Sequence, residues 1–449
     1  MGYGREKKVM NKKAIINILF YALCFCLFFL FTLFAREKGW LSAEIYFFSF
    51  RSRILFLPYA EHSKNIFLTY PLLPLLLSLV SFLPTLIPPA IGTFTTLLLA
   101  KTIPQESSSL FFIPLIITSP FFLLSLFAPT FLLLGIFIAV ACAFIVNYHE
   151  TQSIYYFFIG GITLGFGVLN HLYLFWACLP IILFQLLFFH FPAPRKFSLL
   201  LVSLFPPLFF FAALAFFHWV YSGNPLHFLN HTSFSLGFVV PELFFPVPMN
   251  TAQWFLGLWF VFPLIVVLSL QGLVRLFWAV SALSLSIILF RNLPVSIPIS
   301  FLIIISVLLW RPKSIFLLRI GVILLLLVSA LGWFQLVRGE ETFFYLNHLP
   351  LQDKILDYQH IEEQIDLSSA SILVLDQHYF LSACWKHFTH SVVPESDFFD
   401  QICHHPEDRC SYVLINKEKI DDSQEILNDY HPLWEGRRMV LYSNSKSKQ

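Results

Sequence analysis

Long apolar runs separated by short polar segments make up the first three quarters of the chain. Runs free of Asp, Glu, Lys and Arg cover residues 14–34, 131–146, 154–169 and 197–220. Such continuous runs predict membrane-spanning helices, because a helix of about 20 apolar residues crosses the hydrocarbon core. A membrane barrel would instead show short segments of alternating polarity.

Further charge-free or nearly charge-free runs predict additional spans at 110–127, 173–189, 254–270, 276–290, 295–310 and 315–336. Five prolines interrupt residues 66–101, so we expect 70–83 to lie along the membrane interface and 86–100 to cross once. The pattern predicts an all-α polytopic membrane bundle of about eleven transmembrane helices.

The polarity of the chain changes abruptly after residue 336. Residues 353–365 and 396–403 have helical patterns, whereas 371–375, 411–415 and 439–442 read as strands. Alternating strands and helices predict a small C-terminal α/β soluble domain over 337–449, after a transmembrane domain over 1–336.

Composition supports the membrane class and excludes several others. The chain is 57% hydrophobic and only 12% charged, about half the charge of a soluble protein. A net charge of +2 gives no electrostatic basis for binding nucleic acid. The seven cysteines form no C-x-x-C pair, and no glycine-rich nucleotide motif occurs, which argues against a nucleotide-driven pump.

Basic clusters predict the orientation of the bundle. Arg5, Lys7 and Lys8 precede the first span, and the pairs Arg195–Lys196 and Arg311–Lys313 lie in loops. Since basic loops stay on the cytoplasmic side, we expect a cytoplasmic N-terminus and an exoplasmic C-terminal domain, in a bacterial inner membrane. The outer face then carries the loops 36–65 and 221–251.

The candidate chemistry gathers on that outer face. It comprises the Glu37, Glu44 and Glu61 loop, the corner 128–130, the pair Asn170–His171, the loop 221–251 and the pair Arg291–Asn292. No charged residue lies in the middle of a predicted span, whereas a coupled transporter usually needs one. The distribution favours chemistry at the membrane surface.

Several short motifs resemble membrane glycosyltransferases of the C fold, the relatives of protein mannosyltransferases and lipid A aminoarabinose transferase. The motifs are Ser-Ala-Glu-Ile-Tyr at 42–46, Thr-Tyr-Pro-Leu-Leu-Pro at 69–74 and His-Trp-Val-Tyr-Ser-Gly-Asn-Pro-Leu-His-Phe at 218–228. The Ser-Pro and glycine-rich outline of 119–170 and the tail segments 372–376 and 412–415 are also similar.

The resemblance implies inverting transfer of a sugar from a polyprenyl-phosphate donor to a glycan, lipid or protein acceptor at the outer face. It makes Glu44 the catalytic base. The candidate ligands of the donor phosphate are Arg51, Arg53, Arg291 and His171. The candidate substrate-loop residues are Tyr70, Asn170, Tyr221, Gly223, Asn224 and Pro225.

Simpler roles remain open for most of these residues. Glu44 could be a solvated loop residue, the arginines could be interfacial anchors, and His171 could be structural. Gly223 and Pro225 around Asn224 predict a tight turn. Cys403 and Cys410 could form a disulfide, bind a metal with His404 and His405, or stay thiols.

The sequence also departs from the family pattern. Relatives often carry an Asp near the corner that here reads Ala128-Pro129-Thr130, and a basic residue after the glycine-rich helix, where this chain has Asn170-His171. A divalent metal therefore lacks a clear ligand set. The alternatives to an enzyme are a non-catalytic scaffold of the same fold and a transporter or flippase for a lipid-linked saccharide.

Overall fold

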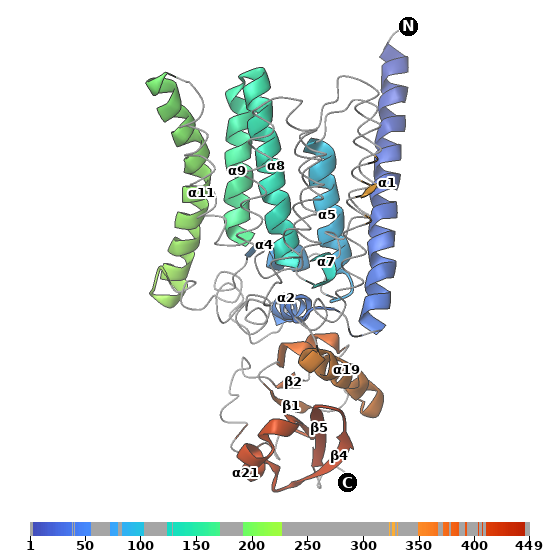
Figure 1. The fold of residues 1–449 in the computed structure, drawn as a ribbon. Helices are drawn as coiled ribbons and strands as arrows, with labels where there is room; N and C mark the ends of the chain where they lie inside the picture. Colours follow the sequence, from blue (N-terminus) through green and yellow to red (C-terminus); the bar gives the residue numbers. More distant parts are fainter. Residues whose placement is uncertain are drawn as a thin grey trace.

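The computed structural model describes residues 3–37, 39, 41–54, 72–79, 83–102, 124–127, 129–170, 192–226, 323, 326–327, 330, 349–366, 371–376, 379–385, 391–392, 403, 406 and 410–444. These residues form an apolar helical bundle and a small mixed domain, with one short helix between them (Figure 1). The predicted spans 173–189, 254–270, 276–290 and 295–310 lie outside the described residues, as do most of 110–127 and 315–336.

The bundle is built from long apolar helices packed side by side. In spatial order they are α1 (Tyr3–Glu37), α5 (Ile87–Thr102), α8 (Pro129–Thr151), α9 (Ile154–Asn170) and α11 (Ala193–Ser222) (Figure 1). Helix α8 is central, and its apolar side chains are almost all buried. Helices α1 and α11 instead expose many large apolar side chains, a surface that suits lipid better than water.

The predicted runs 14–34, 131–146, 154–169 and 197–220 are confirmed as helices. Within the described part of the chain, three helices are long and apolar enough to cross a membrane: Ile18–Glu37, Leu132–Thr151 and Ala193–Ser222. The run 86–100 is the single helix α5, and the segment expected along the interface contains the short helix α4 (Leu72–Leu79). The total of about eleven stays a prediction.

Helices α9 and α11 approach closely because glycines line their contact. A side chain on Gly161 would place its Cβ 3.0 Å from the carbonyl oxygen of Ser203 and 3.1 Å from its Cα. Gly165, one turn further on, faces Phe210 and Pro206 in the same way. Small residues four apart allow such backbone contact between membrane helices.

The predicted outer loop 36–65 contains a helix, α2 (Ala43–Ile54), which lies across the end of the bundle (Figure 1). The backbone N–H of Ser42 donates to the carbonyl of Leu126 in α7 (Leu124–Phe127) at 3.1 Å. The hydroxyl of Ser78 in α4 donates to the carbonyl of Leu75 in its own helix at 2.6 Å and lies 3.2 Å from the carbonyl of Phe48 in α2. Helix α2 is thus bonded to α7 and packs against α4 at this end of the bundle.

The opposite end of the bundle carries the basic N-terminal segment and the pair Arg195–Lys196. Arg195 at the start of α11 donates to the Gln152 side chain at 2.6 Å, in the turn between α8 and α9, and to the Tyr148 hydroxyl at 3.3 Å. Helix α1 begins at that same end, whereas the C-terminal domain lies at the other (Figure 1). This is the arrangement expected from the charges, and its sidedness in the membrane stays a prediction.

The C-terminal domain contains a five-stranded sheet in the order β2-β1-β3-β5-β4. Its elements are α19 (Leu349–Gln364), β1 (Ile372–Leu375), the 3₁₀ helix η3 (Tyr379–Cys384), β2 (Ser391–Val392), β3 (Tyr412–Asn416), α21 (Gln424–Leu427), β4 (Tyr430–Glu435) and β5 (Met439–Asn444). Strands β2, β1 and β3 are parallel, and β5 pairs antiparallel with both β3 and β4. The predicted α/β character is confirmed.

Two features tie this domain together. The buried carboxylate of Asp357 in α19 accepts the backbone N–H groups of Arg437, Arg438 and Met439 at 2.7–3.0 Å, which fixes the β4–β5 turn to the helix. Cys410 lies in a hydrophobic cluster with Leu373 and Val413, and Cys403 packs against it as a second thiol.

The glycine contact predicts a sharp difference between two neighbouring positions. Gly161→Ala should destabilise the bundle by about 1–3 kcal/mol, since the new methyl group meets backbone that cannot rotate away. Gly160→Ala is the matched control, because its Cβ would lie at an ordinary 3.4 Å from the nearest atom, in Ile145. Thermal unfolding of the purified protein in detergent measures both, and equal midpoints would contradict the close contact.

Candidate functional site

Helix α2 carries Glu44 in its first turn and places the side chain inside the protein. The residue is only 1% exposed, although the last turn of the same helix carries Arg51 and Arg53. The carboxyl group lies near Thr130, the second residue of α8. Glu44 therefore stands close to the N-termini of two helices, where backbone dipoles favour a negative charge.

Asn170 connects a third helix, α9, to Thr130. It is the last residue of α9, is fully buried, and donates from Nδ2 to the carbonyl of Thr130 at 2.8 Å. Two of the outer-end positions that the sequence indicated, Glu44 and Asn170, thus meet through Thr130. The corner at 128–130, which lacks the acidic residue of the resembling family, supplies the residue between them.

Several polar atoms around Thr130 are buried without a hydrogen bond. Among the described residues no donor of ordinary geometry reaches either Glu44 oxygen, and Asn170 Oδ1 has no partner. Buried polar groups in proteins are nearly always paired, because an unpaired one has lost its hydration without compensation. A group of such atoms at one place is typical of a site that receives a polar ligand.

Burial governs the protonation of Glu44. It raises the pKa of the carboxyl group to about 8, although the hydroxyl and backbone amide of Thr130 favour the ionised form and lower it. A carboxyl group with a pKa near the working pH can both accept and release a proton. Strong shifts of this kind are concentrated at functional sites.

The two arginines of α2 lie on different faces of the helix. Glu44 and Arg51 are seven residues apart, so about 20° separates them around the axis, whereas Arg53 lies about 180° from Glu44. The Arg51 guanidinium lies over the ring of Phe47, 5.3 Å from its centre. Arg53 donates from Nη1 to the carbonyls of Ala383 and Trp385 in the C-terminal domain, both at 2.8 Å.

The end of α11 forms the predicted tight turn. Gly223 adopts a left-handed conformation (φ 73°), and its N–H donates to the carbonyl of Trp219 at 2.9 Å. The Asn224 side chain accepts the N–H of Leu226 at 3.0 Å. Tyr221 lies in the last turn of the helix.

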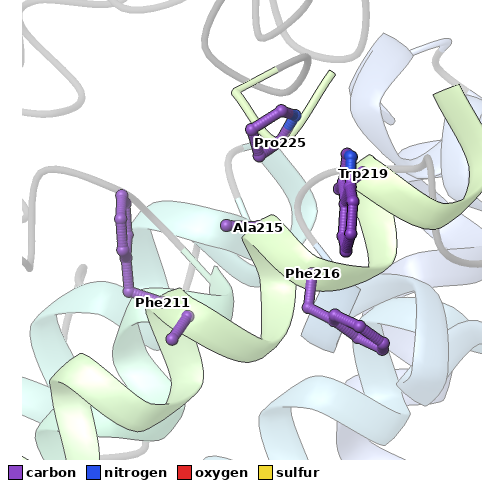
Figure 2. A pocket seen from close by; sticks show the side chains of 6 residues that line it. Phe211, Ala215, Phe216, Trp219 and Pro225 are labelled. Carbon is purple, nitrogen blue, oxygen red and sulfur yellow. The ribbon is translucent and has the colours of Figure 1, made fainter. Parts of the chain in front are cut away.

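Next to this turn, an apolar groove of about 540 Å³ opens on α11. Figure 2 shows Phe211, Ala215, Phe216 and Trp219 following the helix, with Pro225 folded back beside Trp219. Among the described residues, Ala212 completes the lining and no charged side chain contributes to it. The groove suits an apolar chain and lies at the same end of the bundle as α2 (Figure 1).

Three predicted site residues, Tyr70, His171 and Arg291, lie outside the described residues. The sequence indicated the corner 128–130 but gave Thr130 no role of its own, because a lone hydroxyl at a helix end carries no signal of burial. In the part of the chain that the structure describes, no three His, Cys, Asp or Glu side chains are placed to hold a metal ion.

Comparison with known proteins gives a distant likeness to a solved structure. No protein-family model matches the chain, and no curated protein matches it in sequence. Among solved structures, it is similar to the Archaeoglobus fulgidus oligosaccharyltransferase in complex with zinc and sulfate. The match has 13% sequence identity and a TM-score of 0.41, and covers 90% of this chain and 69% of that one. A likeness at this level does not establish a shared fold.

The raised pKa of Glu44 predicts a pH-dependent stability that Glu44→Gln removes. Between pH 4.5 and 8 the unfolded chain ionises this carboxyl group and the folded protein does not, so wild-type stability falls relative to the variant as pH rises. Above about pH 8 the difference should become constant. Unfolding midpoints at pH 5, 7 and 9 measure it, with the exposed Glu363→Gln as control. A wild-type–variant difference that does not change with pH would contradict the burial effect.

Proposed function

We propose that this chain is a membrane glycosyltransferase that moves a sugar from a polyprenyl-phosphate carrier to an acceptor hydroxyl at the outer membrane face. The observation that carries the proposal is the buried Glu44 carboxyl group, which lies beside Thr130 and Asn170 at the end of an apolar bundle. The motif around Glu44 is also one of those that resemble the membrane glycosyltransferases of the C fold.

In the proposed reaction the ionised Glu44 takes the proton of the acceptor hydroxyl. The acceptor oxygen attacks the anomeric carbon while the bond from that carbon to the phosphate oxygen breaks. Polyprenyl phosphate leaves with the bonding electron pair, and the configuration at the anomeric carbon is inverted. A pKa of about 8 leaves part of the enzyme ionised at neutral pH and makes the carboxylate a stronger base than an ordinary Glu.

The departing phosphate needs a positive partner. Arg51 is the described cation on the Glu44 face of α2, and a guanidinium can bind phosphate oxygens in pairs. Arg291 and His171 keep the roles that the resemblance implies. The polar groups of Asn170 and the turn at Asn224 are candidates for contacts with the sugar or the acceptor.

The groove on α11 is the proposed place for the carrier's isoprenoid tail. Its lining is apolar and aromatic, and it includes Pro225 of the turn that follows Gly223. An isoprenoid chain there would stay in the bilayer while its phosphate reached the interface.

A proton-linked transporter of a lipid-linked saccharide is the alternative that the same carboxyl group would serve. A buried group that titrates near neutrality can carry a proton as well as catalyse its transfer. Its position at the end of the bundle, rather than halfway along a described span, favours the enzyme.

Replacing Glu44 by Gln tests the catalytic role. An amide cannot accept a proton at neutral pH, so sugar transfer should fall by about 100- to 10,000-fold. In the wild type, kcat/KM should rise with pH up to about 8, as the carboxyl group ionises. Membranes containing radiolabelled polyprenyl-phosphate sugars provide the assay. Normal transfer by the variant would exclude Glu44 as the base, and proton-dependent lipid flipping without transfer would favour the transporter.

Filling the groove tests the place of the tail. Ala215→Phe should weaken binding of a long-chain polyprenyl phosphate by about tenfold or more, since several buried methylene groups lose their contacts. Binding of a two-isoprene phosphate should change little, because its tail is too short to need the groove. Leu201→Phe, on an exposed part of α11, is the control. Equal losses for both chain lengths would place the tail elsewhere.

A further inference from the structure

The C-terminal domain contacts α2 on the face opposite to Glu44. Tyr46 and Arg53 are seven residues apart and share that face, about 20° from each other around the axis. The Gln359 side chain of α19 donates to the Tyr46 hydroxyl at 3.1 Å. Arg53 donates to the carbonyls of Ala383 and Trp385 at the other end of the helix. The domain is therefore hydrogen-bonded to α2 near both ends of the helix.

The carbonyls that accept from Arg53 belong to a rigid part of the domain. Trp385 is fully buried, donates from its indole to the Tyr358 carbonyl at 2.7 Å, and stacks on the Tyr358 ring with 5.5 Å between centres. The Tyr358 hydroxyl donates to Asp376 at 3.3 Å, and Asp376 also pairs with Lys354 at 3.0 Å. The Lys354 and Asp376 side chains are 8% and 0% exposed. A buried network of this kind holds one geometry.

Both protons of Arg53 Nη1 are used by these two carbonyls. This nitrogen is therefore committed to the C-terminal domain and not to a phosphate on the Glu44 face. The carbonyl acceptors are neutral and orient the guanidinium, whereas the Glu362 carboxylate favours its charged form. Burial, the largest influence on this group, lowers the pKa of Arg53, which fits a side chain enclosed between two parts of the protein.

We propose that Arg53 is a positioning residue: together with Tyr46, it docks the C-terminal domain on α2 and so sets the position of Glu44 against Thr130. Helix α2 is bonded to α7 and packs against α4 on the bundle side, so a displacement of its outer face moves Glu44 through one short helix. The effect on catalysis rests on the proposed function, whereas the docking itself does not.

Cys384 offers a native reporter of the docking. It lies in η3 beside Arg53, between the two carbonyls that Arg53 binds, and burial raises the pKa of its thiol and so suppresses the reactive thiolate. Cys384 is half-buried, and undocking should expose its thiol further. Its alkylation by N-ethylmaleimide can be followed by peptide mass spectrometry in the full-length protein, without removing other cysteines.

The experiment compares Arg53→Ala with the neighbouring Arg51→Ala. Arg53→Ala should speed Cys384 alkylation by about tenfold or more, as expected for loss of hydrogen bonds to a charged group. It should also lower kcat and leave the affinity for a short-chain polyprenyl phosphate within about twofold of wild type. Arg51→Ala should do the reverse: weaker phosphate binding and normal alkylation. Tyr46→Phe, which keeps the ring and loses only the Gln359 bond, should speed alkylation to a smaller degree.

Unchanged Cys384 alkylation in both Arg53→Ala and Tyr46→Phe would overturn the docking role. Weaker phosphate binding by Arg53→Ala with normal alkylation would make Arg53 a phosphate ligand instead. Faster alkylation with normal kcat would overturn the link from docking to Glu44. If the wild type transfers no sugar at all, the proposed function fails, and the alkylation rates still decide whether Arg53 docks the domain.

Discussion

Helix α2 packs against an apolar bundle on one side and against a polar domain on the other. Its 12 residues therefore contact both parts of the molecule. Phe47, Phe48 and Phe50 are 5% exposed or less, so the helix is enclosed rather than resting on a surface. An enclosed helix has to pair each polar side chain it carries. Tyr46 and Arg53 find their partners in the C-terminal domain, whereas the Glu44 carboxylate has none of ordinary geometry among the described residues.

The buried Glu44 carboxyl group makes this end of the bundle a place where a proton can be exchanged. A carboxyl group away from water resists ionisation, and two nearby helix N-termini only partly offset the cost. Gln or Met, whose side chains are similar in size to that of Glu, would remove the cost of ionising a buried group at this position. A protein that keeps Glu there loses stability above the ordinary pKa of the group, which is the usual compromise at sites where a proton moves.

The rest of the bundle sets which groups surround this carboxyl group. Gly161 and Gly165 let α9 and α11 approach until their backbones touch, while Gly160 packs α9 against Ile145 and Ala141 of α8. Because Asn170 is the last residue of α9, its bond to Thr130 depends on that packing. Glycine contacts near the middle of the bundle and hydrogen bonds at its end are therefore parts of one arrangement.

The sequence by itself determined the elements whose signal is local. Continuous apolar runs specify α1, α8, α9 and α11, because in lipid a backbone can satisfy its hydrogen bonds only within a helix. Short apolar strands between polar turns likewise revealed β1, β3 and β5. The sequence did not predict strand β4, because Pro432 interrupts its pattern. A proline is tolerated there because β4 lies at the edge of the sheet.

Tertiary structure alone decided the chemistry of α2. Its aromatic-rich sequence is compatible with helix, strand or interfacial loop. Only the observed helix defines the faces on which Glu44, Arg51 and Arg53 lie. The sequence suggested one role for both arginines, yet half a turn of rotation separates them. The burial of Glu44 depends on Thr130 and Asn170, 86 and 126 positions away along the chain. No local pattern encodes such contacts, because they arise only when α8 and α9 pack against α2.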